Sequence, residues 1–97
     1  MLKMTNDVQS LYRILLEEIK TINTPCPVDI EHEGTVATFY IWQKRNNGPI
    51  YIATKKGQKL VIYSVSKKTG KMEFVASEYT SVLIRQGRDP NTGFLTE

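Results

Sequence analysis

Hydrophobic residues recur at steps of three and four near the N-terminus. This spacing places side chains on one face of an α-helix and predicts a helix over residues 6–23. Thr5 or Asn6 can cap its first turn through a side-chain oxygen. Pro25 disfavours helical geometry in the preceding residue, so the helix must end before it. The predicted apolar face consists of Met4, Val8, Leu11, Leu15, Ile19 and Ile22, widened by Tyr12 and Leu16.

After Pro27 the hydrophobic period changes to two, which is typical of β-strands. β-branched and aromatic residues fill these segments, and short loops rich in lysine, asparagine or glycine separate them. Consecutive strands joined by short loops favour an antiparallel meander. The predicted sheet covers residues 28–76 in five strands, at 28–32, 35–43, 50–54, 59–66 and 71–76.

The pattern over residues 77–97 fits two structures. Ser77 can cap a short helix over 78–86 that Gly87 ends. Alternatively, the β-branched residues continue as strand, and residues 89–93 form a hairpin turn. We therefore expect a single α+β domain over residues 1–97. An N-terminal amphipathic helix packs on one face of a five-stranded, mostly antiparallel meander sheet, and a short C-terminal helix or hairpin follows.

Alternation along the strands sorts their residues into two sets. We expect the apolar set to pack on the helix: Ala37, Phe39, Ile41, Ile50, Ile52, Leu60, Ile62, Met72 and Phe74. The other set mixes aromatic rings with lysines: Thr38, Tyr40, Trp42, Lys44, Tyr51, Ala53, Lys55, Lys59, Val61, Tyr63, Val65, Lys71, Glu73 and Val75. Tyrosine and tryptophan suit a half-wet surface, because the ring can be covered while its polar atom stays satisfied.

Composition excludes several classes of site. The 97 residues are 40% hydrophobic and 24% charged, as in an ordinary globular domain. A single cysteine, Cys26, and a single histidine, His32, rule out an internal disulfide and a Cys/His zinc site. Asp29, Glu31 and Glu33 alternate, which we interpret as an exposed edge strand rather than a metal site. We expect no enzyme activity, cofactor or metal.

Charge is distributed unevenly along the chain. The net charge is +3, yet residues 35–72 contain eight bases and no acid. The flanking segments are acidic, with net charges of −3 over residues 1–34 and −2 over residues 73–97. A stretch of this kind produces a strong local positive field and attracts anionic partners.

Lysine neutralises phosphates, and exposed rings stack on unpaired bases. The leading hypothesis is therefore a small non-enzymatic binding protein whose basic, aromatic sheet face contacts a polyanion, with nucleic acid as the favoured partner. The candidate binding residues are Tyr40, Trp42, Lys44, Arg45, Tyr51, Lys55, Lys56, Lys59, Tyr63, Lys67, Lys68 and Lys71.

Other interpretations stay open. The rings can instead pack under the C-terminal segment or a second subunit, with the lysines as solvated turn residues. The alternative function is a protein-interaction module or small inhibitor, of an accessory or mobile-element type, that docks on an acidic protein. No apolar run is longer than four residues, as at residues 60–63, so we expect no membrane span and a cytoplasmic protein. So small a chain buries only about 60–65% of the surface that its unfolded form exposes, and a homodimer would add stability.

Overall fold

The computed structural model describes residues 2–3 and 8–96, and the side chains of residues 11–31 and 33–96. Its strands form one sheet in the order β1-β2-β3-β4-β5-β6. The elements are β1 (Leu2–Lys3), α1 (Val8–Glu18), β2 (Cys26–His32), β3 (Thr35–Gln43), β4 (Ile50–Lys56), β5 (Lys59–Val65), β6 (Met72–Tyr79) and α2 (Thr80–Arg85). The predicted α+β class and five-strand meander are confirmed by β2 to β6, which pair antiparallel in sequence order. The sequence did not predict β1, which pairs parallel with β2.

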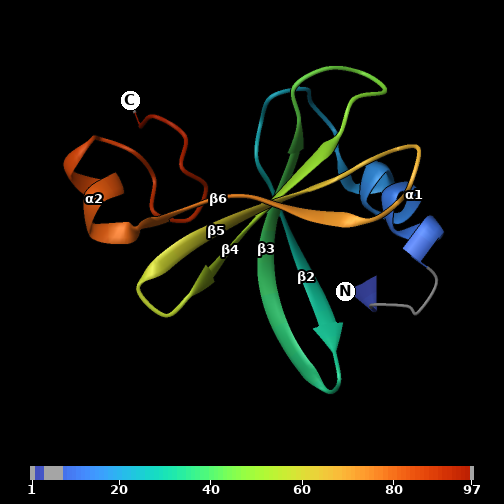
Figure 1. The fold of residues 1–97 in the computed structure, drawn as a ribbon, viewed down its shortest axis with the longest axis horizontal. Helices are drawn as coiled ribbons and strands as arrows, with labels where there is room; N and C mark the ends of the chain where they lie inside the picture. The colour runs from blue at the N-terminus through green and yellow to red at the C-terminus, as the bar shows by residue number, and fades with distance from the viewer. Residues whose placement is uncertain (1, 4–7, 97) are drawn as a thin grey trace.

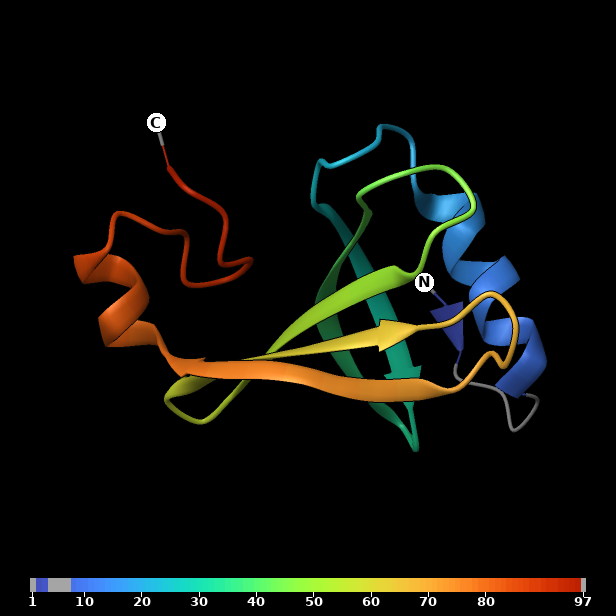
Figure 2. The ribbon, with the colours of Figure 1, turned by 45° about the horizontal axis from the view of Figure 1, so that its top comes forward.

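The sheet is strongly twisted, so that its strands fan out from a common centre in Figure 1. The two helices lie at opposite ends of the molecule (Figures 1 and 2). Each face of the sheet carries its own core. One core lies under α1 around Leu15 and Ile41, and the other lies under the C-terminal segment around Trp42 and Leu83. None of the described helices has the length and apolarity needed to cross a membrane.

Helix α1 is shorter than its hydrophobic pattern predicts. Leu15 and Tyr12 are buried against the sheet as expected, but Leu16 is 40% exposed and Ile22 is 37% exposed. The predicted contribution of these last two residues to the buried face is therefore wrong. Helix α1 ends at Glu18 rather than at residue 23. The predicted caps at residues 5 and 6, and Met4, lie outside the described residues.

Contacts with the sheet explain the early end of α1. The N–H of Ile19 donates to the carbonyl of Leu16 at 3.2 Å, a tighter turn than an α-helix. Cys26 Sγ lies 3.3 Å from the carbonyl of Glu18 and donates to it. Asn23 adopts a left-handed φ of 58° and donates its N–H to the carbonyl of Gln43 at 2.6 Å. These bonds turn the chain into β2 before the periodic pattern has ended.

Strand β5 faces the opposite way from the prediction. Tyr63 lies opposite Ile52, and directly opposite residues share a face, so Tyr63 faces α1. Leu60 and Ile62 lie on the other face, in the core around Trp42. Both alternating sets of β5 are mostly apolar, so the hydrophobic pattern alone does not fix the register. The residues assigned to the wrong face are Lys59, Leu60, Val61, Ile62, Tyr63 and Val65.

Beyond β5 the chain forms both of the structures that the sequence left open. Strand β6 continues to residue 79, so Ser77 is a strand residue and not a helix cap. Helix α2 follows, and Gly87 ends it with a φ of 73° while Arg88 N–H donates to Leu83 O at 2.8 Å. Residues 89–93 then turn, and Asp89 N–H donates to Phe94 O at 2.8 Å. Helix and hairpin turn thus occur one after the other.

Candidate functional site

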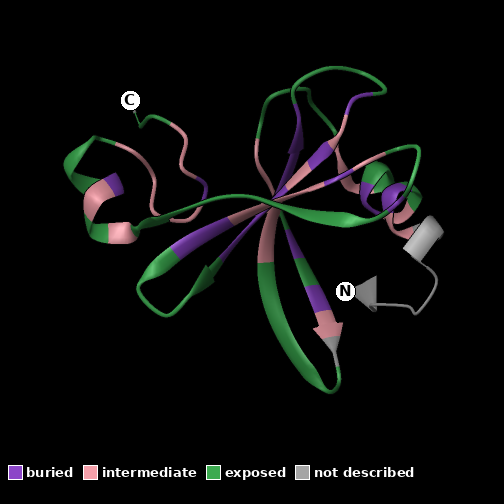
Figure 3. Ribbon diagram, viewed as in Figure 1, coloured by how far each residue is buried: buried purple, intermediate pink, exposed green. Residues whose placement is uncertain are grey.

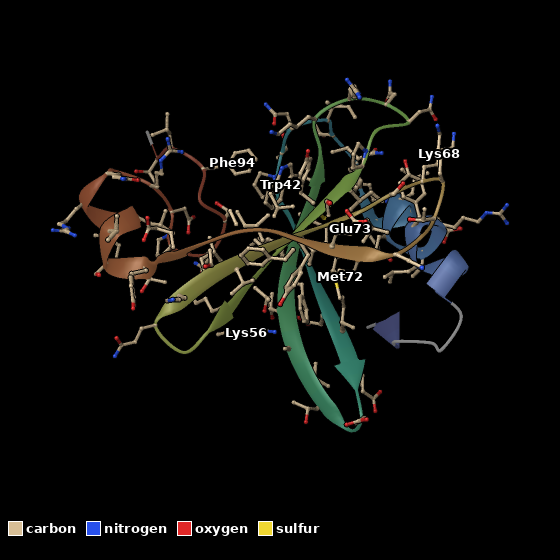
Figure 4. The ribbon with its side chains drawn as sticks, viewed as in Figure 1. Trp42, Lys56, Lys68, Met72, Glu73 and Phe94 are labelled. Atoms are coloured by element: carbon tan, nitrogen blue, oxygen red, sulfur yellow. The ribbon has the colours of Figure 1, made fainter. Side chains whose placement is uncertain are left out.

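The twelve candidate residues do not form one surface. Gln43, Ile50, Val65 and Met72 lie level across the sheet, so the β3–β4 and β5–β6 loops leave it at the same end. The β4–β5 hairpin lies at the other end. Figure 4 shows this separation. The cations at the end with the β3–β4 and β5–β6 loops are called the loop cluster, which consists of Lys44, Arg45, Lys67, Lys68 and Lys71. The cations at the end with the β4–β5 hairpin are called the tip cluster, which consists of Lys55, Lys56 and Lys59.

A hydrogen bond joins the two loops of the loop cluster. Lys67 Nζ donates to Asn47 Oδ1 at 3.2 Å. Gly70 closes the β5–β6 turn with a φ of 67°, and its N–H donates to the carbonyl of Ser66 at 2.8 Å. All five cations of the loop cluster are exposed to solvent. The cluster therefore groups cations that are more than 20 residues apart in the chain.

A buried polar network supports the β3–β4 loop. Tyr12 OH donates to the carbonyl of Gly48 at 2.8 Å, and Gln43 Nε2 lies 3.0 Å from both Tyr12 OH and that carbonyl. Gln43 is only 2% exposed. A Cβ atom on Gly48 would lie 2.9 Å from Arg45 Cγ, so the loop closes around a glycine. The network fixes the loop that carries two of the cations. Sequence reasoning missed it, although a glutamine at an apolar position of the alternation was a usable signal.

Trp42 does not offer its ring to solvent. It is 4% exposed and packs with Leu83 in the second core. Its ring stacks on Tyr51 with centroids 5.9 Å apart, and Phe94 meets it edge-on at 5.0 Å. Figure 4 shows Phe94 beside Trp42. Trp42 therefore packs under the C-terminal segment, which was the structural interpretation considered from the sequence.

The tyrosines are divided between the two faces. Tyr40 and Tyr51 are half-buried on the Trp42 face, whereas Tyr63 is half-buried on the α1 face. Lysines of the same chain cover some of these rings. Lys44 Nζ lies 5.0 Å from the ring centroid of Tyr51. Lys56 Nζ lies 5.3 Å from that of Tyr63 and donates to its hydroxyl at 2.9 Å. The rings do not combine into a single platform for bases.

Glu33 is separated from the other two alternating acids, and the edge-strand interpretation is wrong, because β1 pairs with β2. Asp29 Oδ1 accepts a hydrogen bond from Thr38 Oγ1 at 2.7 Å, within the sheet. Glu33 lies beyond the end of β2, in the turn to β3, with a φ of 52°. Among residues 8–96, no group of three or more His, Cys, Asp or Glu side chains is placed to hold a metal ion.

Exposed cations on two linked loops are thus the main chemical feature of the described surface. No protein-family model matches this chain, and no curated protein or solved structure matches it.

Proposed function

We propose that the chain is a non-enzymatic binding protein whose loop cluster contacts a polyanion, with nucleic acid as the leading partner. The observation that carries the proposal is the bond between Lys67 and Asn47, which groups five exposed cations at one end of the sheet. Residues 35–72 contain no acid that would pair with these cations within their own segment. Such a cluster attracts a partner of high and regular negative charge density.

The chemistry of the cluster suits phosphates. Each lysine that neutralises a phosphate releases a condensed counterion, which makes binding favourable at low salt. Arg45 adds a planar group that can hold two phosphate oxygens at once. The β3–β4 loop that carries Arg45 is supported by Tyr12 and Gln43, so little ordering is required when it binds.

The burial of Trp42 determines which part of a nucleic acid the protein can contact. Base stacking needs an open ring face, and Trp42 is covered by Phe94 and Leu83. We therefore expect contacts with the sugar–phosphate backbone rather than with bases. Single strands and duplexes should then bind with similar affinity, and sequence should have little effect.

The same observation supports a second candidate. A basic surface without an open ring suits the carboxylates of an acidic protein as well as phosphates. The chain would then be an interaction module or small inhibitor that docks on an acidic partner through the loop cluster.

Fluorescence anisotropy with three labelled probes separates these proposals: a single-stranded oligonucleotide, the matching duplex and polyglutamate. For a nucleic-acid protein, log affinity should fall linearly with log salt, with slopes of about −0.7 per contacted phosphate for single strands and −0.9 for duplexes. The double substitution Lys67→Gln/Lys68→Gln should reduce the single-strand slope by up to about 1.4, because two fewer phosphates are neutralised.

A matched control lies at the other end of the sheet. Lys55 and Lys56 are also adjacent and exposed, but they belong to the tip cluster. Lys55→Gln/Lys56→Gln removes the same charge and should leave the slope nearly unchanged. Equal effects of the two double variants would contradict the loop cluster as the site. Failure of both nucleic acids to bind at low salt would remove the leading proposal, and selective binding of polyglutamate would favour the acidic partner.

A further inference from the structure

Strand β6 presents an open edge of the sheet. It is the last strand in the order, and no described residue pairs with its outer side. Figure 2 shows no element in front of it, and Figure 3 shows it exposed along its length. Proteins usually protect such edges with charged side chains, lysine above all, or with proline; Met72–Tyr79 contains no lysine or proline, and its charged residues are Glu73 and Glu78. Its exposed large apolar side chains are Met72 (43%), Phe74 (63%), Val75 (47%) and Tyr79 (48%).

We propose that β6 pairs antiparallel with β6 of a second copy of this chain, about a two-fold axis between Phe74 and Val75. The two sheets would then join into one. A two-fold axis perpendicular to the sheet reverses the strand direction but keeps each face on its own side. Residues that lie opposite each other across the axis must therefore share a face. This requirement can be checked against β6 as it stands.

A β-bulge in β6 decides which residues share a face. Val75 is the extra residue, because Ala76 lies opposite Ile62 while Phe74 lies opposite Tyr63, the next residue of β5. An extra residue shifts the alternation by one position. Before the bulge Met72 and Phe74 face α1, whereas after it Ser77 and Tyr79 do. An axis between Phe74 and Val75 therefore places Met72 opposite Ser77 with matching faces.

Charge then selects among the face-matched registers. With this axis, a pairing that extends one residue beyond the start of β6 places Lys71 opposite Glu78 of the second copy, and symmetry repeats the pair. Glu73 lies opposite Ala76. Moving the axis by one residue toward the C-terminus would place Glu73 opposite Glu78, and like charges directly opposite each other are destabilising. The positions of Lys71 and Glu78 thus favour a self-complementary edge.

Both charged groups are available in the single chain. Lys71 is exposed, and its backbone N–H donates to Thr69 Oγ1 at 3.2 Å, which fixes the start of β6. Glu78 Oε1 accepts the N–H of Tyr79 at 2.8 Å. A carboxylate has about four lone-pair sites, so Glu78 can accept a lysine as well. Burial of Phe74 would supply affinity, while the ion pairs would set the register.

Sedimentation velocity of the full chain, without any polyanion, tests the proposal over about a hundredfold range of concentration. The wild-type chain should associate to a dimer. Lys71→Glu and Glu78→Lys each replace two attractive pairs by two repulsive ones and should weaken association by about tenfold. Combining the two reversals restores opposite charges and should return the affinity to within about threefold of the wild type.

Controls separate this pairing from general charge effects. Lys71→Glu lowers the net charge of +3 by two units, which by itself would favour association, so weakening must come from the pair. Lys68→Glu makes the same change outside the pairing and should not weaken the dimer. Val75→Lys places a cation beside the axis in each copy and should abolish it.

Two outcomes would overturn the proposal, once circular dichroism has shown that the variants are folded. The first is a wild-type chain that stays monomeric at every concentration, because β6 then does not pair with itself and its edge is open only to a strand of another protein. A dimer insensitive to Val75→Lys and to both single reversals would have its contact elsewhere.

Discussion

Gln43 shows how one polar side chain can link three elements. It lies in the set of strand residues that faces α1, where its neighbours are apolar, and it is buried. A buried polar group without a partner costs about 1–3 kcal/mol, so its position requires acceptors. Tyr12 on α1 and the carbonyl of Gly48 in the β3–β4 loop supply them. The position of the β3–β4 loop, which carries two cations of the loop cluster, therefore depends on a residue that carries no charge.

Replacement of Gln43 should be costly although the shape is nearly kept. Gln43→Leu removes the donor to both the Gly48 carbonyl and Tyr12 OH, and should lower the free energy of unfolding by about 1–3 kcal/mol. Urea denaturation followed by circular dichroism measures this. Gln58→Leu is the control, because Gln58 is exposed in the hairpin turn and a change within about 0.5 kcal/mol is expected. Similar losses in both variants would contradict the supporting role of Gln43.

At the scale of elements, α1 is anchored by a few positions. Leu15 is completely buried against the sheet, whereas its neighbour Leu16 is 40% exposed. The two leucines have the same chemistry and lie side by side in the same helix, and they differ strongly in burial. Replacing each leucine by alanine therefore separates the contribution of packing, at Leu15, from that of helix propensity, at Leu16.

Leu15→Ala should lower the free energy of unfolding by about 2–5 kcal/mol, because it leaves a cavity between α1 and the sheet. Leu16→Ala should cost less than about 1 kcal/mol, since alanine is a better helix former than leucine and little burial is lost. Thermal unfolding of the two variants side by side decides the matter. Equal destabilisation would mean that α1 docks through a different face.

An element could be predicted well where its hydrophobic pattern clearly favoured one structure and one buried face. Strand β3 was predicted with its observed bounds, because Thr35–Gln43 combines β-branched and aromatic residues between turn signals. Helix α1 was predicted too long, because Ile19 and Ile22 continue the helical period and the bond from Asn23 to Gln43 is not visible in the sequence. The faces of β5 could not be assigned from the sequence, since both alternating sets of Lys59–Val65 are mostly apolar.

At the scale of the whole molecule, the candidate site could be predicted only in part. The cations were found, and alternate loops of a meander lie at the same end, so the pattern could also have separated the loop cluster from the tip cluster. The covering of Trp42 was one of two interpretations that the sequence left open, because residues 77–97 contain no signal for the face on which they return. Their docking decides that the rings form a core rather than a platform.

Trp42 is the single tryptophan of the chain, and it reports on this docking. Phe94→Ala should open its ring to water, raise its quenching by acrylamide and cost about 2 kcal/mol of stability. The far-ultraviolet circular dichroism should stay unchanged, because the sheet does not depend on Phe94. Leu95→Ala, at a neighbouring residue that is 68% exposed, should leave the quenching as it is. Strong quenching in the wild type would contradict the burial of Trp42.

The covering of both faces of β4 also has a consequence for hydrogen exchange. Ile52, Ala53 and Thr54 are consecutive and all buried, so water cannot approach their backbone from either side. Their amide protons should exchange only when the whole domain opens. Those of β6 lie at an exposed edge and should exchange through local fraying. Local stability thus decreases from β4 at the centre of the sheet to β6 at its edge. A second strand bound at that edge would slow the exchange of the β6 amides and reduce this difference.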